Sequence, residues 1–124
     1  MYYPISIRFD AAGTTADAVT LALHERVEIL GAFVITNTTI AADGAEFATV
    51  SILGNDGATA IYSRTTSSTA LTAHTPAAMD SANKQELAIF DSGSAIKVQL
   101  AKTGSSGVAF DGIIVLDCRQ ARKY

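Results

Sequence analysis

The chain has 124 residues, of which 48% are hydrophobic and 17% are charged, and its formal net charge at pH 7 is −3. This length predicts one domain, residues 1–124, that buries a core of its own, and so apolar a composition excludes a disordered chain. The lack of a basic excess excludes general nucleic-acid binding. The low charge indicates that Ser and Thr form much of the polar surface, or that a partner protein covers some apolar surface.

The N-terminus does not have the pattern of a secretory signal, because no charged segment is followed there by an apolar run. No apolar stretch approaches the roughly 18 residues of a transmembrane helix. We therefore expect synthesis in a host cytoplasm without export through a secretion pathway, and no membrane partner.

Alternation of apolar and polar residues predicts strands, because successive side chains of a strand point to opposite faces. Residues 1–9 form an N-terminal arm and first strand, in which Ile5, Ile7 and Phe9 alternate with polar residues. Pro4 favours an extended conformation for the residue before it.

Ala16–Leu30 fits two structures. The apolar residues at odd positions predict strands, and an overlapping set with helical spacing predicts a helix. The strand set is Val19, Leu21, Leu23, Val27 and Ile29, and the helical set is Val19, Ala22, Leu23, Val27 and Leu30. The β-branched content and the surrounding pattern favour strands, with His24–Arg26 as a turn or bulge.

The middle of the chain predicts a run of strands. Ala32–Thr36 begins with apolar residues at consecutive positions, which indicates burial on both faces. Phe47–Leu53 alternates and is interpreted as a central strand. Gly54–Gly57 tolerates the positive φ of a hairpin turn, so Thr59–Thr65 is predicted as the partner strand.

Thr66–Lys84 is the longest irregular stretch and is rich in Ser, Thr and Ala. A connection of this length in a small domain is usually functional or mobile. Proline suits the first turn of a helix, so we expect a short helical turn near Pro76–Ala82.

Three further strands are predicted at Leu87–Phe90, Ile96–Lys102 and Val108–Cys118. Turn signals recur about every 8 to 12 residues, the rhythm of a β-sandwich or barrel. We therefore predict an all-β, antiparallel fold with Thr66–Lys84 as its one long irregular loop. Cys118 ends an apolar strand and is expected in the core.

No cluster of residues points to catalysis or metal binding. His24 and His74 have no second His or Cys at ligand spacing, and no serine lies in a Gly-x-Ser-x-Gly elbow. The loop carboxylates are interpreted as turn formers, since Asp bonds its own nearby backbone; they are Asp43, Glu46, Asp56, Asp80, Asp91 and Asp111. We expect no cofactor, no metal and no enzymatic activity.

Both ends of the chain carry residues suited to protein contacts. The N-terminal arm holds Tyr2, Tyr3 and Pro4, and residues 119–124 form a basic tail with Arg119, Arg122, Lys123 and Tyr124. Tyrosine gains by covering apolar surface, so these residues are poorly suited to free ends. Two interpretations stay open: the ends dock on a neighbouring subunit or partner, or they fold back onto their own sandwich.

The segment from Gly31 to Leu116 carries a recognisable succession of motifs. They are the Ala-Asp loop Ile40–Gly44, the strand Phe47–Ile52, the turn Asn55–Gly57, the strand end Leu100–Gly104 and the closing strand Ile113–Leu116. This succession resembles small β-rich virion proteins of tailed bacteriophages, of the capsid decoration or cement type. The resemblance implies a jelly-roll-like sandwich on the capsid surface, commonly a homotrimer, that contacts the major capsid protein and performs no catalysis.

The alternative hypothesis is a receptor- or glycan-binding module of a phage tail or fibre. In that case Thr66–Lys84 presents a binding rim at one end of the sandwich. The absence of tryptophan argues against it.

Overall fold

The computed structural model describes residues 2–83 and 85–121, and its regular elements are almost all strands. The strands are β1 (Tyr2–Ala11), β2 (Asp17–Ala22), β3 (Val27–Thr36), β4 (Phe47–Leu53), β5 (Ala60–Thr65), β6 (Ala77–Ala78), β7 (Asp80–Ser81), β8 (Ile89–Phe90), β9 (Ala95–Thr103) and β10 (Phe110–Gln120). One turn of 3-10 helix, η1 (Gln85–Ala88), precedes β8.

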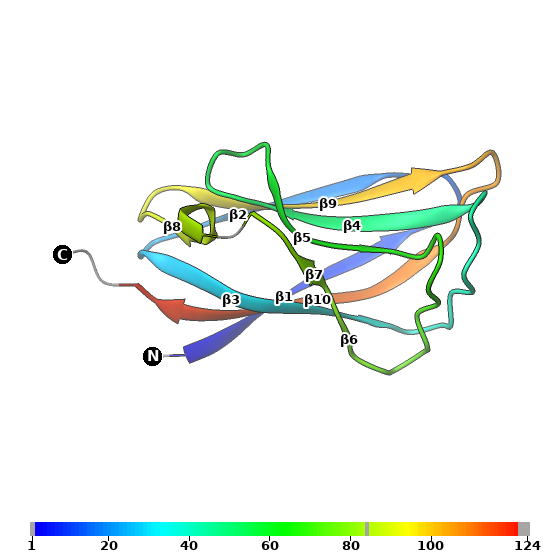
Figure 1. Cartoon of the computed structure of the whole chain (residues 1–124), viewed down its shortest axis with the longest axis horizontal. Helices are drawn as coiled ribbons and strands as arrows, with labels where there is room; N and C mark the ends of the chain where they lie inside the picture. The colour runs from blue at the N-terminus through cyan, green and yellow to red at the C-terminus, as the bar shows by residue number, and fades with distance from the viewer. Residues whose placement is uncertain (1, 84, 122–124) are drawn as a thin grey trace.

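The strands form two stacked sheets (Figure 1). Sheet A has the order β1-β10-β3-β6, with β8 also paired to β3, and sheet B has the order β2-β9-β4-β5-β7. All the pairings are antiparallel, and the first long strand pairs with the last. Two sheets connected in this order are a jelly roll, so the predicted antiparallel, jelly-roll-like sandwich is confirmed.

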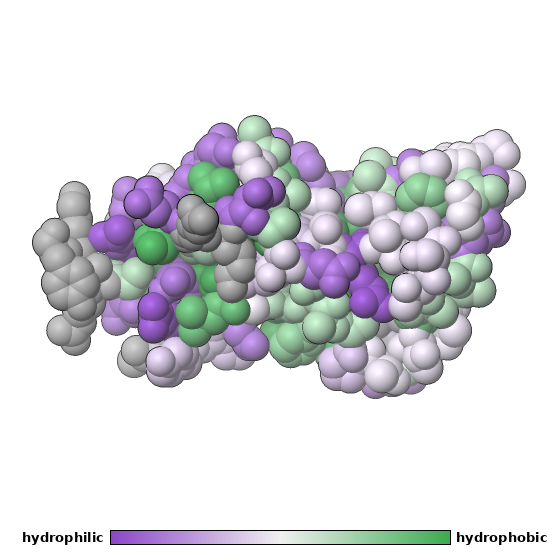
Figure 2. All heavy atoms as spheres, viewed as in Figure 1, coloured by the Kyte–Doolittle hydropathy of each residue, from purple (hydrophilic) through white to green (hydrophobic). Residues whose placement is uncertain are grey.

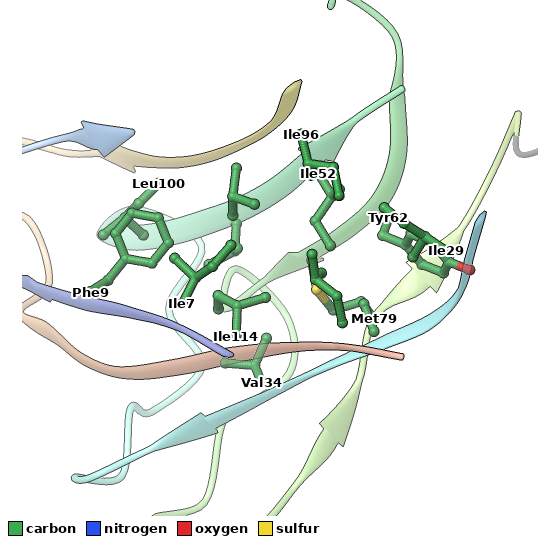
Figure 3. Packing of buried hydrophobic residues seen from close by; sticks show 14 of the residues in the cluster. Ile7, Phe9, Ile29, Val34, Ile52, Tyr62, Met79, Ile96, Leu100 and Ile114 are labelled. Carbon is green, nitrogen blue, oxygen red and sulfur yellow. The ribbon is translucent and has the colours of Figure 1, made fainter. Parts of the chain in front are cut away.

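The core lies between the inner faces of the two sheets (Figure 3). Sheet A contributes Ile7, Phe9 and Ile114, and sheet B contributes Ile52 and Ile96, each at most 5% exposed. Burial of each such side chain contributes about 1.5–3 kcal/mol of transfer free energy. The alternation read in the sequence therefore produces one continuous core.

Ala16–Leu30 consists of strands, and the helical alternative is wrong. β2 pairs with β9 along its whole length, from Asp17 opposite Leu100 to Ala22 opposite Ala95. Between β2 and β3 the chain turns, and the backbone of Leu23 exchanges hydrogen bonds with the β8–β9 turn. The apolar residues of the predicted strand set thus face the core: Leu23, Val27 and Ile29 are buried, and Val19 and Leu21 pack against the core.

A bulge in β3 reverses the phase of its alternation. Gly31 lies opposite Asp117 and Ile29 lies opposite Cys118, so β3 holds one extra residue, Leu30, at this point. Before the bulge Val27 and Ile29 are buried, and after it the buried residues have even numbers, from Ala32 on. Leu30 and Gly31 therefore both lie on the outer side of the sheet, which a strand of constant phase does not allow.

The expected helical turn near Pro76–Ala82 is wrong. Ala77 and Ala78 pair with β3 in sheet A, and two residues later Asp80 and Ser81 pair with β5 in sheet B. Between them Met79 is 6% exposed, and its side chain enters the core at the crossing (Figure 3). Its backbone N–H donates to Ala32 O at 2.9 Å. Burial of this one side chain holds the segment extended, in preference to the weak helical signal of Pro76.

The bounds of β8 and β10 are among those that differ from the predicted ones. Leu87 lies in η1, so the short strand before the β8–β9 turn begins at Ile89. β10 begins at Phe110 and continues through Arg119 and Gln120, so the first part of the basic tail is sheet.

Candidate protein-interaction face

The two ends of the chain meet at one edge of sheet A. Tyr2 lies opposite Arg119, Tyr3 opposite Cys118, and Pro4 opposite Asp117 in the β1–β10 pairing. This pairing brings the N-terminal arm next to Arg119, the one residue of the predicted basic contacts that the structure describes. Both segments are strands of their own sandwich. Arg122, Lys123 and Tyr124 lie outside the described residues.

Tyr2 and Tyr3 have different surroundings because neighbouring strand residues point to opposite faces. The hydroxyl of Tyr3 donates to Glu25 Oε1 at 2.9 Å. Burial, followed by this hydrogen bond, raises the pKa of Tyr3 to about 12. Tyr2, in contrast, is 74% exposed on the outer side of β1.

Arg119 is fixed by an ion pair with Glu28 of the neighbouring strand β3. Its Nε donates to Glu28 Oε1 at 2.7 Å. The hydrogen bond to Glu28, with a further one involving Tyr2, raises the pKa of Arg119. Tyr2, Arg119 and Glu28 thus lie side by side on three neighbouring strands of sheet A.

The centre of the outer face of sheet A is apolar. Phe33 lies opposite Val115, and Ile35 lies opposite Ile113. Phe33, Ile35 and Ile113 are half-buried, and no sheet formed by the described residues lies above them. We name this surface the A face; its members are Tyr2, Pro4, Ser6, Arg8, Asp10, Glu28, Leu30, Gly31, Phe33, Ile35, Asp111, Ile113, Val115, Asp117 and Arg119.

A hollow of about 370 Å³ lies at the end of the A face that holds the termini. We call it the terminal hollow, and its lining residues are Tyr2, Tyr3, Pro4, Leu30, Asp117 and Cys118. In the same end of the molecule, strongly hydrophobic and strongly hydrophilic residues lie next to one another, whereas the opposite end is mostly pale (Figure 2).

Charged side chains lie at both ends of the A face. At the end away from the termini, the Arg8 guanidinium lies 2.8 Å from Asp111 and 3.9 Å from Asp10. At the terminal end Arg119 pairs with Glu28. Asp117 lies beside that pair, is exposed, and forms no ion pair with any residue in 2–83 or 85–121.

The outer face of sheet B has a different composition. Gln99 lies opposite Ser51, and Ser51 lies opposite Ser63. In the next row the hydroxyls of Thr49 and Thr65 are 3.2 Å apart and hydrogen bonded. Small polar side chains of this kind are well solvated, so this face needs no cover.

Two of the loop carboxylates, Asp43 and Asp56, have structural roles in the described chain. No group of three or more His, Cys, Asp or Glu residues lies together within 2–83 and 85–121. Asp43 and Asp56 accept backbone N–H groups two and three residues ahead, which confirms them as turn formers. Cys118 is buried as predicted, and burial raises its pKa to about 11.

The described residues include no helix of the length and apolarity that a membrane crossing requires.

The sequence prediction included Tyr2 and Arg119 and missed the centre of the A face. The sequence predicts burial on both faces for the start of the strand that holds Phe33 and Ile35, and a central place in its sheet for the run Ile113–Leu116. The signal for Leu30 was present in the sequence, since alternation changes phase between Ile29 and Ala32. A phase change within one strand indicates a bulge, and a bulge places two successive residues on one side.

No family model and no curated protein sequence matches the chain. Among solved structures, the fold is similar to a chain of "Structure of infectious bursal disease virus Gx strain", at 17% identity and a TM-score of 0.41. The match covers 100% of this chain and 33% of that one, so this chain spans about a third of its length. A likeness this distant does not extend to function.

Proposed function

We propose that this protein is a structural component of a virus particle. It is a capsid decoration, or cement, protein that stabilises a phage head from the outer surface. Its partners are the major capsid protein and further copies of itself in a homotrimer.

The A face is the observation that carries this proposal. It has an apolar centre formed by Phe33, Ile35 and Ile113, and charged or aromatic residues such as Arg119 and Tyr2 at its ends. Specific protein interfaces combine an apolar centre with a polar rim and are enriched in Tyr and Arg. With the A face on the shell, the small polar side chains of sheet B face the solvent.

The fold gives support by analogy only. Jelly rolls occur in viral capsid and lectin domains, and one fold serves many functions. The motifs between Ile40 and Leu116 favour the capsid member of that pair. A decoration protein needs no reactive site: it adds buried area between capsid subunits, and many copies on a closed lattice act together. Lasting attachment requires an interface of about 1,000 Å² or more.

The test is cosedimentation of the purified protein with shells assembled from the coat protein of the same virus, together with its mass in solution. We expect saturable binding to shells, a higher melting temperature of the decorated shells, and a trimeric mass. A strict monomer with no affinity for the shells contradicts the proposal.

The second candidate is a receptor- or glycan-binding module, and one observation favours it. A hollow of about 430 Å³ at the end of the sandwich opposite the termini is lined by Thr38–Asp43, Glu46 and Gly107–Ala109. Its carboxylates, however, already accept backbone N–H groups. The predicted rim Thr66–Lys84 is also fastened to both sheets, because Ala77–Ala78 pairs with β3 of sheet A and Asp80–Ser81 pairs with β5 of sheet B. Leu71 in addition forms a bridge with Ile40 of the β3–β4 loop. If the protein binds glycans on a sugar array and loses this binding when Thr66–Lys84 is shortened, the second candidate is supported over the first.

A further inference from the structure

The terminal hollow holds the exposed large hydrophobic residues of the described chain. These are Tyr2, 74% exposed, and Leu30, 36% exposed, and they come from β1 and β3 on either side of β10. A single bulge turns Leu30 outward, and bulges are features that re-aim a side chain. Two apolar side chains that converge on one hollow suit an inserted apolar side chain of a partner.

The charges around the hollow define the partner further. The Asp117 carboxylate lines the hollow and forms no ion pair within the described residues, whereas Glu28, Asp10 and Asp111 are each paired with an arginine. Among the residues that the structure describes, the A face carries four carboxylates, those three and Asp117, against two guanidinium groups, Arg8 and Arg119. It therefore has an excess of two negative charges.

This excess argues against a second copy of the same face as the occupant. At the terminal end Glu28 and Asp117 outnumber Arg119, and at the other end Asp10 and Asp111 outnumber Arg8. Two A faces packed together bring acidic groups together in either orientation, and like charges across an interface are unfavourable. A complementary surface carries basic side chains.

We propose that the A face binds another protein at a place where an apolar side chain stands beside a lysine or arginine. The apolar side chain enters the terminal hollow against Leu30 and Tyr2, and the cation pairs with Asp117. The inference rests on the proposed function, and it assigns this surface to the coat protein of the shell. The trimer contacts then lie elsewhere on the sandwich.

The experiment measures the affinity of four single variants for coat-protein shells, with the unmodified chain as reference. Leu30→Asp places a charge in the hollow, and Asp117→Asn removes the charge of the carboxylate. The matched controls on sheet B are Ala101→Asp, a new carboxylate at an exposed strand position, and Asp80→Asn, loss of an exposed strand carboxylate. Thermal denaturation of each variant verifies that it folds.

We expect Leu30→Asp to weaken binding about tenfold or more, as at an interface hot spot. Asp117→Asn weakens it about two- to fivefold, the range of an accessible ion pair, and makes binding less sensitive to added NaCl. The sheet B controls bind as the unmodified chain does, and all four variants keep the oligomeric mass.

Two results overturn this inference while the proposed function stands. One is binding that is unaffected by Leu30→Asp and Asp117→Asn but lost in the sheet B controls. The other is conversion of the trimer to a monomer by Leu30→Asp, which assigns the A face to contacts between copies. Failure of the unmodified chain to bind shells overturns the proposed function, and this inference with it.

Discussion

The carboxylate of Glu46 accepts the backbone N–H of Gly107 at 2.7 Å and so ties the β3–β4 loop to the β9–β10 turn. The backbone N–H groups of Ser105 and Ser106 donate to the same carboxylate at 3.1 to 3.3 Å. These bonds favour the charged form, and they lower the pKa of Glu46, with the bond from Gly107 as the largest cause. One side chain thereby closes the end of the sandwich opposite the termini.

The contribution of Glu46 to folding is expected to disappear in acid. Its pKa is lower in the folded than in the unfolded chain, so the contribution is complete above the unfolded value, about 4.3, and is lost as the pH falls through the folded value. Glu46→Gln should therefore lower the melting temperature at pH 7, and the two curves should converge at low pH. Glu86→Gln, at an exposed carboxylate of η1, is the control and should follow the unmodified chain. If the melting temperature of Glu46→Gln stays below that of the unmodified chain by the same amount at every pH, the expectation is contradicted.

Gly107 is required by its backbone and by its neighbour. Its φ is +69°, and a Cβ at this position would lie 2.3 Å from the carbonyl oxygen of Gly13. Gly57 has a similar φ of +71° with nothing within 4 Å of a Cβ. A substitution at Gly57 therefore measures the cost of the positive φ alone, without a steric clash. We expect Gly57→Ala to lower the free energy of unfolding by about 1–2 kcal/mol, and Gly107→Ala by clearly more. Urea denaturation measures both, and equal losses would show that the contact with Gly13 relaxes without cost.

Thr36 and Thr66 are both 1% exposed and differ in their hydrogen bonds. The hydroxyl of Thr36 has no hydrogen-bond partner within residues 2–83 and 85–121, whereas that of Thr66 accepts the backbone N–H of Ala48 at 3.1 Å. An unsatisfied buried hydroxyl costs about 1–3 kcal/mol. Thr36→Val should therefore raise the free energy of unfolding by about 1 kcal/mol, and Thr66→Val should lower it by a similar amount. If both substitutions destabilise, the Thr36 hydroxyl is satisfied by a buried water.

We expect substitution of Tyr3 to affect mainly the stability of the fold, and substitution of Tyr2 to affect mainly binding to shells. Tyr3→Ala removes a side chain that packs against the core and bonds Glu25, and it should cost about 2 kcal/mol of unfolding free energy, less than a fully buried aromatic. Tyr2→Ala should change stability by less than about 0.5 kcal/mol and weaken binding to shells. Denaturation curves and cosedimentation of the two variants decide this. Equal loss of stability in both would show that the whole N-terminal arm belongs to the core.

The sequence by itself determined the local structure at most positions. The period-two alternation in Ile5–Phe9, Phe47–Leu53 and Ile96–Lys102 predicts strands because every second side chain of a strand faces the core. The Gly-Asn-Asp-Gly turn predicts a hairpin because its residues accept positive φ. These features depend only on neighbours along the chain, and the structure confirms them.

The tertiary structure decided what depends on distant residues. The termini became neighbours because β1 pairs with β10, a choice made across the whole chain. Pro76–Ala82 is extended because Met79 is buried between two sheets, and no local pattern carries that information. The A face arose in the same way: alternation shows which residues share a side of a strand, but only the stacking of sheet B on sheet A decides which side stays uncovered. The phase change in the sequence marks Leu30, but only the pairing of β3 with β10 brings Leu30 and Asp117 to one hollow, where we expect them to meet a partner.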